Sequence, residues 1–238
     1  MRSSSTAAAE RQALVRALRE RGPTADTLCE GWTAHDLAVH VVARDSHPHV
    51  IFGRELPVVG SRAQEQYRSI EQLSFAELVD RIEAGVPSWH PARSRAVDDA
   101  MNTLEFFVHT EDVLRVDEST ASPGPDEERT GAGGEDSRAD SQQTGTDDGP
   151  ESSSALQSHR RRPSQGLQRR LWKQASRTLL MAAARKQRRR ITYISPGYGS
   201  VTHGGSNDPM LSLEGTPGEL VLWAFGRQSV ADVVVRRH

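Results

Sequence analysis

The stretch "NTLEFFVHTEDVLR", residues 102–115, decides how the chain folds. Drawn as a helix, it carries large apolar side chains around most of its circumference, which is typical of a buried, central helix. Yet it also places Glu105 and His109 four positions apart, on one helical face. Charged groups are rarely buried unless they are paired or bound to something. The stretch therefore predicts a central helix whose Glu–His pair has a partner elsewhere in the chain.

A second helix is predicted over "GWTAHDLAVHVVARD", residues 31–45. Thr33 fits an N-cap, and Asp36 fits the acidic first turn of a capping-box-like start. Further along the same face lie His40 and Arg44, within a stretch otherwise suited to packing. A lone histidine on such a face is usually a satisfied core residue. Here it is a second imidazole in a chain whose central helix already offers a carboxylate and an imidazole.

His40, Glu105 and His109 on facing helices would form a three-ligand site of the kind that holds catalytic zinc, with the fourth position left to water or substrate. Divalent transition metals suit this set of two nitrogens and one oxygen, and zinc has the least demanding geometry. A metal would compensate the buried carboxylate and keep both imidazoles deprotonated. The alternative is a structural bundle whose Glu–His pair is only hydrogen-bonded.

Other polar side chains are candidates around this site. Asp36 and Asp112 lie within a helical turn of the predicted ligands and are expected to orient their imidazoles, although Asp36 also suits a helix start. Arg44 and Arg227 are candidate clamps for a carboxylate on a substrate or cofactor, the alternative being structural arginines. Cys29 is expected to pack as a small apolar residue rather than to act as a nucleophile or ligand.

The middle of the chain separates its parts. Residues 117–164 are rich in Gly, Ser, Asp and Glu and nearly free of large apolar side chains, which predicts a disordered acidic insertion. We expect residues 1–116 and 165–189 to form one helical bundle, and residues 190–238 a small α+β unit. The remaining helices are expected over residues 5–22, 74–85, 98–115, 166–187 and 216–228, and strands over residues 190–199, 210–215 and 230–237.

Composition limits the classes of function. The 238 residues carry a formal net charge of -2, one cysteine and no apolar stretch of the length that a membrane span needs. The N-terminus lacks an apolar signal core, so we expect a soluble cytoplasmic protein. Arginine clusters such as "RKQRRR" come without a nucleic-acid-binding motif and with only 5% aromatic residues, which argues against nucleic acid. His47 and His49 are read as loop histidines rather than as a second metal site. The oligomeric state is left open.

Two segments together carry a resemblance. "TLCEGWTAHDLAVHVVARD" and "NTLEFFVHTEDVLR" are similar to the N-terminal metal-binding domain of the mycothiol-dependent maleylpyruvate isomerase family, which has a DinB-like four-helix bundle. The resemblance implies that Trp32 and Asp36 precede the ligand His40, and that Glu105 and His109 complete the site. "GTPGELVLWAFGRQ" resembles a segment near the end of such proteins, where a Gly-Arg pair follows an apolar helix. The long insertion is a departure from the family.

The expected fold is therefore mainly α, with a DinB-like bundle and a small C-terminal α+β unit. A thiol entering the open metal position would bind as thiolate and could add to an electrophilic carbon, as in thiol S-transfer or isomerisation. Mycothiol as cosubstrate is implied by the resemblance, and the expected partners are a small-molecule thiol and an electrophilic substrate. Hydrolysis by an activated water and metal binding without catalysis, as in a sensor or interaction protein, are the alternatives. No catalytic residue is identified beyond the metal ligands.

Overall fold

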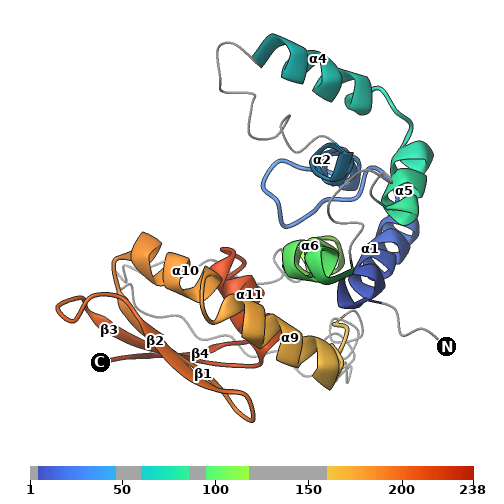
Figure 1. Ribbon diagram of the computed structural model, residues 1–238. Coiled ribbons are helices and arrows are strands. Elements are labelled where there is room, and N and C mark those ends of the chain that lie inside the picture. Colours follow the sequence, from blue (N-terminus) through green and yellow to red (C-terminus); the bar gives the residue numbers. More distant parts are fainter. Residues whose placement is uncertain (1–4, 47–59, 86–94, 118–159) are drawn as a thin grey trace, which may run out of the picture.

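The computed structural model describes residues 5–46, 60–85, 95–117 and 160–238. The described chain is rich in helix and carries one small sheet, as predicted at this coarse level (Figure 1). None of its helices is long and apolar enough to cross a membrane. The helices are α1 (Thr6–Arg21), α2 (Ala34–Ser46), α4 (Gly60–Glu71), α5 (Phe75–Ala84), α6 (Arg95–Leu114), α9 (Gln165–Ala175), α10 (Leu179–Gln187) and α11 (Pro217–Ala224), and the strands are β1 (Arg190–Ser195), β2 (Gly199–His203), β3 (Met210–Glu214) and β4 (Val234–Arg237).

Helix α6 is the central element, as its apolar circumference predicts. Figure 1 shows it between the N-terminal helices and the unit formed by α9, α10, α11 and the sheet. Phe106 and Phe107 are both fully buried, but they belong to two different hydrophobic clusters. Because consecutive residues of a helix point about 100° apart, one helix can supply side chains to both cores.

The first core joins α6 to the N-terminal helices. Its side chains come from the apolar stripes of α1, α2 and α5, and α6 packs most extensively along α1. Local signals fix the ends of these helices: Ser5 caps α1, and Ser74 forms a capping box with Glu77 at the start of α5. The buried members of this core include Leu14, Leu18, Leu37, Val41, Leu78, Ile82, Phe106 and Val113.

The second core lies between the sheet and its helices. The strand order is β2-β1-β3-β4, with β1 and β3 parallel and both outer pairs antiparallel. Along β1, the residues Ile191, Tyr193 and Ser195 are buried in alternation, which is the period of a strand with one covered face. The helices α9, α10 and α11 cover that face, and the Tyr193 hydroxyl donates to the Leu180 carbonyl at 3.0 Å (Figure 1). The sheet and the three helices that cover one of its faces thus form a two-layer α/β unit.

The structure differs from the predicted single helix over residues 166–187. It forms α9 and α10, separated by a turn at residues 176–178, where Ser and Thr side chains compete for backbone hydrogen bonds. The break shifts the buried stripe by one residue: Leu180 is buried where a continuous helix would bury Leu179. The buried side chains of both helices belong to the second core and not to the N-terminal one. We therefore place residues 165–189 with the C-terminal unit.

Two further differences concern segments whose sequences carry little apolar signal. Helix α4 was not anticipated, because only Tyr67 and Ile70 give it an apolar side, and these pack on the first core. Residues 160–164, assigned to the predicted insertion, are ordered: Ser164 caps α9, and Arg161 forms ion pairs with Glu10 and Glu111. Most of the predicted insertion, together with His47 and His49, lies outside the described residues.

Candidate metal centre

Three predicted ligands meet in the first core. His40 lies on α2, whereas Glu105 and His109 lie one turn apart on α6. Each offers one ligand atom, and these atoms all lie within 4.8 Å of one another. His109 Nε2 and Glu105 Oε2 are 3.4 Å apart, and two atoms bound tetrahedrally to one zinc ion at about 2 Å are separated by about the same distance. The predicted trio therefore forms a group that can hold a metal ion.

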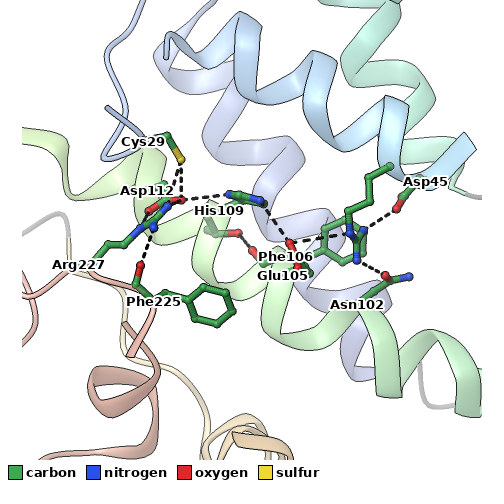
Figure 2. Close-up of polar contacts among 11 residues, drawn as sticks. Cys29, Asp45, Asn102, Glu105, Phe106, His109, Asp112, Phe225 and Arg227 are labelled. Atoms are coloured by element: carbon green, nitrogen blue, oxygen red, sulfur yellow. Dashed lines mark hydrogen bonds and ion pairs between the residues drawn. The ribbon is translucent and has the colours of Figure 1, made fainter. Parts of the chain in front are cut away.

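His109 is held in the orientation that a ligand needs. Its Nδ1 lies 3.1 Å from Asp112 Oδ2, and its Nε2 faces Glu105 (Figure 2). Burial would lower the pKa of His109, but hydrogen bonds with Asp112, Cys29 and Glu105 raise it well above the usual value for an imidazole. Without a metal, these contacts favour the protonated form of the ring. A cation at the trio would take the place of the Nε2 proton, while Asp112 keeps the Nδ1 proton.

His40 differs from His109 in having no polar partner. Its ring packs against Trp32, with centroids 5.1 Å apart, and edge-on against His109, with centroids 5.5 Å apart. Within the described residues we find no hydrogen bond to either of its ring nitrogens. Burial, helped by the charge on His109, lowers the pKa of His40 to about 4. A neutral imidazole with a free lone pair is the form that binds a metal ion.

Glu105 would supply the single oxygen ligand and is more accessible than His109. Its side chain is 33% exposed, whereas that of His109 is 11% exposed. Burial raises the pKa of its carboxyl, but the hydrogen bond with His109 and the positive charge of Arg44 outweigh this and lower it to about 2. The carboxylate is therefore charged and reachable from solvent. Any open coordination position would be entered on its side of the site.

A second candidate group shares His109 with the first. Cys29, His109 and Asp112 also bring their ligand atoms within 4.8 Å of one another. However, Asp112 already accepts four contacts (Figure 2), from His109 Nδ1, Cys29 Sγ, Arg227 Nε and Arg227 Nη2. Burial would raise the pKa of Asp112, yet His109 and Arg227 lower it. Because both of its oxygens are engaged, the Asp112 group is less suited to a cation than the His40 group.

The structure separates the two predicted supporting aspartates. Asp112 is fully buried against His109, where it was expected. Asp36 is exposed, and its Oδ2 accepts from the backbone N–H and hydroxyl of Thr33 at 2.9 and 2.6 Å. These bonds lower the pKa of Asp36 and satisfy donors at the start of α2. The expected role of Asp36 in orienting His40 is thus replaced by helix capping.

Both predicted clamp arginines have partners within the protein. Arg44 donates to Asp45 at 2.8 Å and to Asn102, and its Nε lies 3.9 Å from Glu105. Arg227 makes a bidentate contact with Asp112 at 2.7 and 2.8 Å and donates to Cys29 Sγ at 3.1 Å. Arg44 therefore lies close to the predicted ligand Glu105. Arg227 contacts Asp112, which orients the predicted ligand His109. Neither guanidinium is held in open space for a substrate.

The environment of Cys29 was not anticipated. Its Sγ lies 3.3 Å from Asp112 Oδ2 and contacts Arg227, so it is part of the polar cluster behind His109 (Figure 2). The predicted packing role captures only its partial burial against the first core. The sequence signal that could have located it is "TLCEGWT" directly before α2, since a loop leading into a ligand helix passes close to the site.

A cavity of about 530 Å³ adjoins the site on the side of Arg227. The loop before α2 and the segment after α11 form its walls, and Trp32 and Arg227 lie among the lining residues. Each of these two side chains contacts a residue of the site, His40 or Asp112. The three ligands themselves do not line it. The cavity therefore borders the site without opening directly onto the ligand atoms.

Comparisons of the chain with family models, with characterised proteins and with solved structures give no significant match.

Proposed function

We propose that this chain is a divalent-metal-binding protein with His40, Glu105 and His109 as ligands, and that zinc is the ion they suit best. The observation that carries the proposal is the convergence of two imidazole nitrogens and one carboxylate oxygen from two helices. A neutral set of nitrogens with one oxygen suits zinc, which imposes little geometric demand. His40 strengthens the case, because a partly buried imidazole to which the described residues make no hydrogen bond gains a partner by binding an ion.

The surrounding side chains complete the centre as supporting groups. Asp112 fixes the His109 ring through Nδ1 and is itself held by Arg227 from the far end of the chain. Metal-bound histidines usually donate their second ring nitrogen to a carboxylate in this way. Arg44 lies close enough to Glu105 to keep its carboxylate ionised. These contacts support a site in which three ligands are oriented before the ion arrives.

We further propose that the metal serves thiol S-transfer or thiol-assisted isomerisation. A zinc ion with an open position lowers the pKa of a thiol that coordinates it and so supplies a nucleophilic sulfur. Glu105, one-third exposed, marks the accessible side of the site. The cavity beside Trp32 and Arg227 has a volume suited to a small molecule. We assign it to the body of the thiol cosubstrate, and the resemblance to the mycothiol-dependent family makes mycothiol the first thiol to test.

Metal binding without catalysis is the second candidate, and one observation favours it. The residues that line the cavity do not include any of the three ligands, so a molecule seated there would have to reach past Trp32 or Arg227. A sensor or interaction protein needs no such access. Both candidate functions require the metal, but only the first predicts catalytic turnover.

Elemental analysis of the purified protein tests the metal. We expect close to one zinc ion per chain in the wild type and none in His40→Ala or Glu105→Ala. His35→Gln is the matched control, because His35 lies on the same helix and hydrogen-bonds Leu73 outside the site. Its metal content should equal that of the wild type. Metal retained by His40→Ala and Glu105→Ala would end the proposal.

Loss of free thiol in the presence of electrophiles tests the chemistry. Zinc-loaded protein is mixed with mycothiol, N-acetylcysteine or glutathione and a panel of maleyl and alkyl electrophiles. We expect zinc-dependent consumption of one thiol, abolished in Glu105→Ala and retained in His35→Gln. Isomerisation returns the thiol, so conversion of a maleyl electrophile to its isomer is followed as well. A protein that binds zinc stoichiometrically but neither consumes thiol nor isomerises the electrophile would support the non-catalytic candidate.

A further inference from the structure

The C-terminal unit carries an excess of positive charge that the metal site does not use. Residues 160–190 contain twelve Arg or Lys residues and no Asp or Glu, although the whole chain has a formal net charge of -2. Some of these side chains are structural: Arg161 is buried between Glu10 and Glu111. Others, on α10, have no such role. Like charges gathered on one helix repel one another, so their placement calls for a reason.

Two of the unused arginines border a pocket of about 580 Å³. Arg185 and Arg188 reach it from the C-terminal end of α10, and Thr202 and His203 from the end of β2. The glycine pair at residues 204–205 forms another part of its wall. The volume is within the range of small-ligand sites. None of the residues that line it belongs to the metal centre or to the cavity beside Arg227.

The charges at this pocket are unbalanced. Arg185 and Arg188 are exposed and have no carboxylate partner within the part of the chain that the structure describes. The one acidic residue in the wall, Asp208, accepts the Gly205 N–H at 2.8 Å and thereby closes the turn. Two guanidinium groups therefore face a single engaged carboxylate. This differs from Arg115, which has two carboxylate partners.

The wall of the pocket is fixed by backbone contacts. His203 lies with Nε2 2.6 Å from the Ser176 carbonyl, so Nε2 carries the proton and Nδ1 is left for another partner. Gly204 has φ +107°, and a Cβ there would lie 2.2 Å from the Arg189 carbonyl oxygen, so only glycine fits. The loop after β2 is thus held tightly against the segment that carries Arg188. The arrangement is built before any ligand arrives.

We propose that this pocket binds the phosphate group of a small phosphomonoester. Guanidinium groups bind phosphate oxygens in a bidentate manner, and two of them match the charge of a phosphate dianion. The Thr202 hydroxyl, which lies 2.9 Å from the Thr192 hydroxyl, is a further donor for a phosphate oxygen, and the glycine pair admits a ligand close to the backbone. The concave shape favours a small molecule over a polynucleotide, which would need a long track of contacts.

Isothermal titration calorimetry of the full chain with adenosine 5′-monophosphate and with inorganic phosphate tests the proposal. We expect saturable binding of one monoester per chain, with inorganic phosphate competing. Arg185→Gln/Arg188→Asn should weaken it at least about tenfold, because both charge-assisted contacts with the phosphate are lost. Asparagine is chosen at position 188 because the residue there has φ 51°, which asparagine tolerates.

Arg169→Gln/Lys173→Gln is the matched control, since it removes two exposed charges of the same basic segment outside the pocket. Its affinity should stay within about twofold of the wild type, since charges this exposed are largely screened. Arg185→Lys keeps the charge and should lose part of the affinity. This variant distinguishes the bidentate contact of the guanidinium group from general attraction by positive charge. Equal weakening in both double variants, or no saturable binding, would overturn the proposal. So would a twenty-nucleotide single strand that binds while the monoester does not, which would indicate a nucleic-acid surface.

Discussion

Two clusters of buried charge on α6 differ in how they are satisfied. Around Arg115, every charge meets its opposite: the guanidinium pairs with Glu111 and Glu219, and Glu111 also pairs with Arg161. Around Glu105, about three turns earlier along the chain, two imidazoles and a carboxylate converge, and within the described residues no hydrogen bond reaches the His40 ring. A fully paired cluster is complete without a ligand. A cluster with an imidazole lone pair to spare can take up an ion, which is the role we propose for the trio.

The Arg115 cluster also connects distant parts of the chain. Glu111 lies on α6 and Arg115 directly follows its last residue, Glu219 lies on α11, and Arg161 joins Glu10 of α1 to the same group. It therefore ties the C-terminal unit to the N-terminal helices at the opposite face of α6 from His40. We assign it to stability, and the trio around Glu105 to function.

The largest effect is expected when the paired cluster loses its centre. Arg115→Met removes the guanidinium partner of Glu219 and leaves Glu111 with Arg161 alone, which should lower the free energy of unfolding by about 3–5 kcal/mol. Urea denaturation followed by circular dichroism measures it. Arg115→Met/Glu219→Gln removes a charge of each sign and should recover part of the loss. A single variant as stable as the wild type would show that the cluster is solvated.

The trio around Glu105 should respond to loss of a member in the opposite way. His40→Leu removes a partly buried imidazole to which no described residue makes a hydrogen bond, so the metal-free protein should lose little stability. The wild type should gain about 2.7 kcal/mol from zinc at one hundred times its dissociation constant, and His40→Leu should gain nothing. Urea denaturation with and without zinc gives both numbers. Equal stabilisation of the two proteins by zinc would place the ion elsewhere.

The supporting carboxylate is expected to have the next largest effect. Asp112→Asn weakens the hold on the His109 ring, and loss of such a partner typically lowers metal affinity about 10–100-fold. Competition with a chromogenic chelator measures the dissociation constant. Asp36→Asn is the matched control: this residue caps α2 through Thr33, so its variant should bind zinc like the wild type. A loss of affinity for Asp36→Asn as well would restore the role first predicted for it.

Features that depend on residues close together in the chain could be predicted from the sequence, whereas features that depend on distant residues could not. The buried α6, the caps at Ser74 and Thr33, and the trio of ligands arise from helical spacing and could be read locally. The break between α9 and α10 could not, because the apolar stripe of residues 166–187 is compatible with one straight helix. The packing of these helices on the sheet depends on contacts that no local pattern encodes.

The charged partners show the same limit. Asp112 was predicted from its distance to His109 along one helix, but its contact with Arg227 spans 115 positions. The Arg161 pairs span 50 and 151 positions and start from a segment whose composition predicts disorder. Composition describes the average character of a segment, whereas a single buried ion pair can order one residue at the end of that segment. Interactions of this kind appear only once the fold has brought the partners together.

The smallest effect is expected just beyond the end of α6, where charge is paired but not buried. Asp117 accepts from Arg21 at 2.6 Å, and its side chain is 52% exposed. Exposed ion pairs contribute little, because water screens the attraction and both side chains lose freedom, so Asp117→Asn should cost less than about 1 kcal/mol. The cost should shrink further in 1 M salt, as measured by urea denaturation, whereas that of Arg115→Met should persist. A large, salt-resistant cost for Asp117→Asn would mean that pairing alone stabilises α6, and burial would no longer separate the structural cluster from the metal centre.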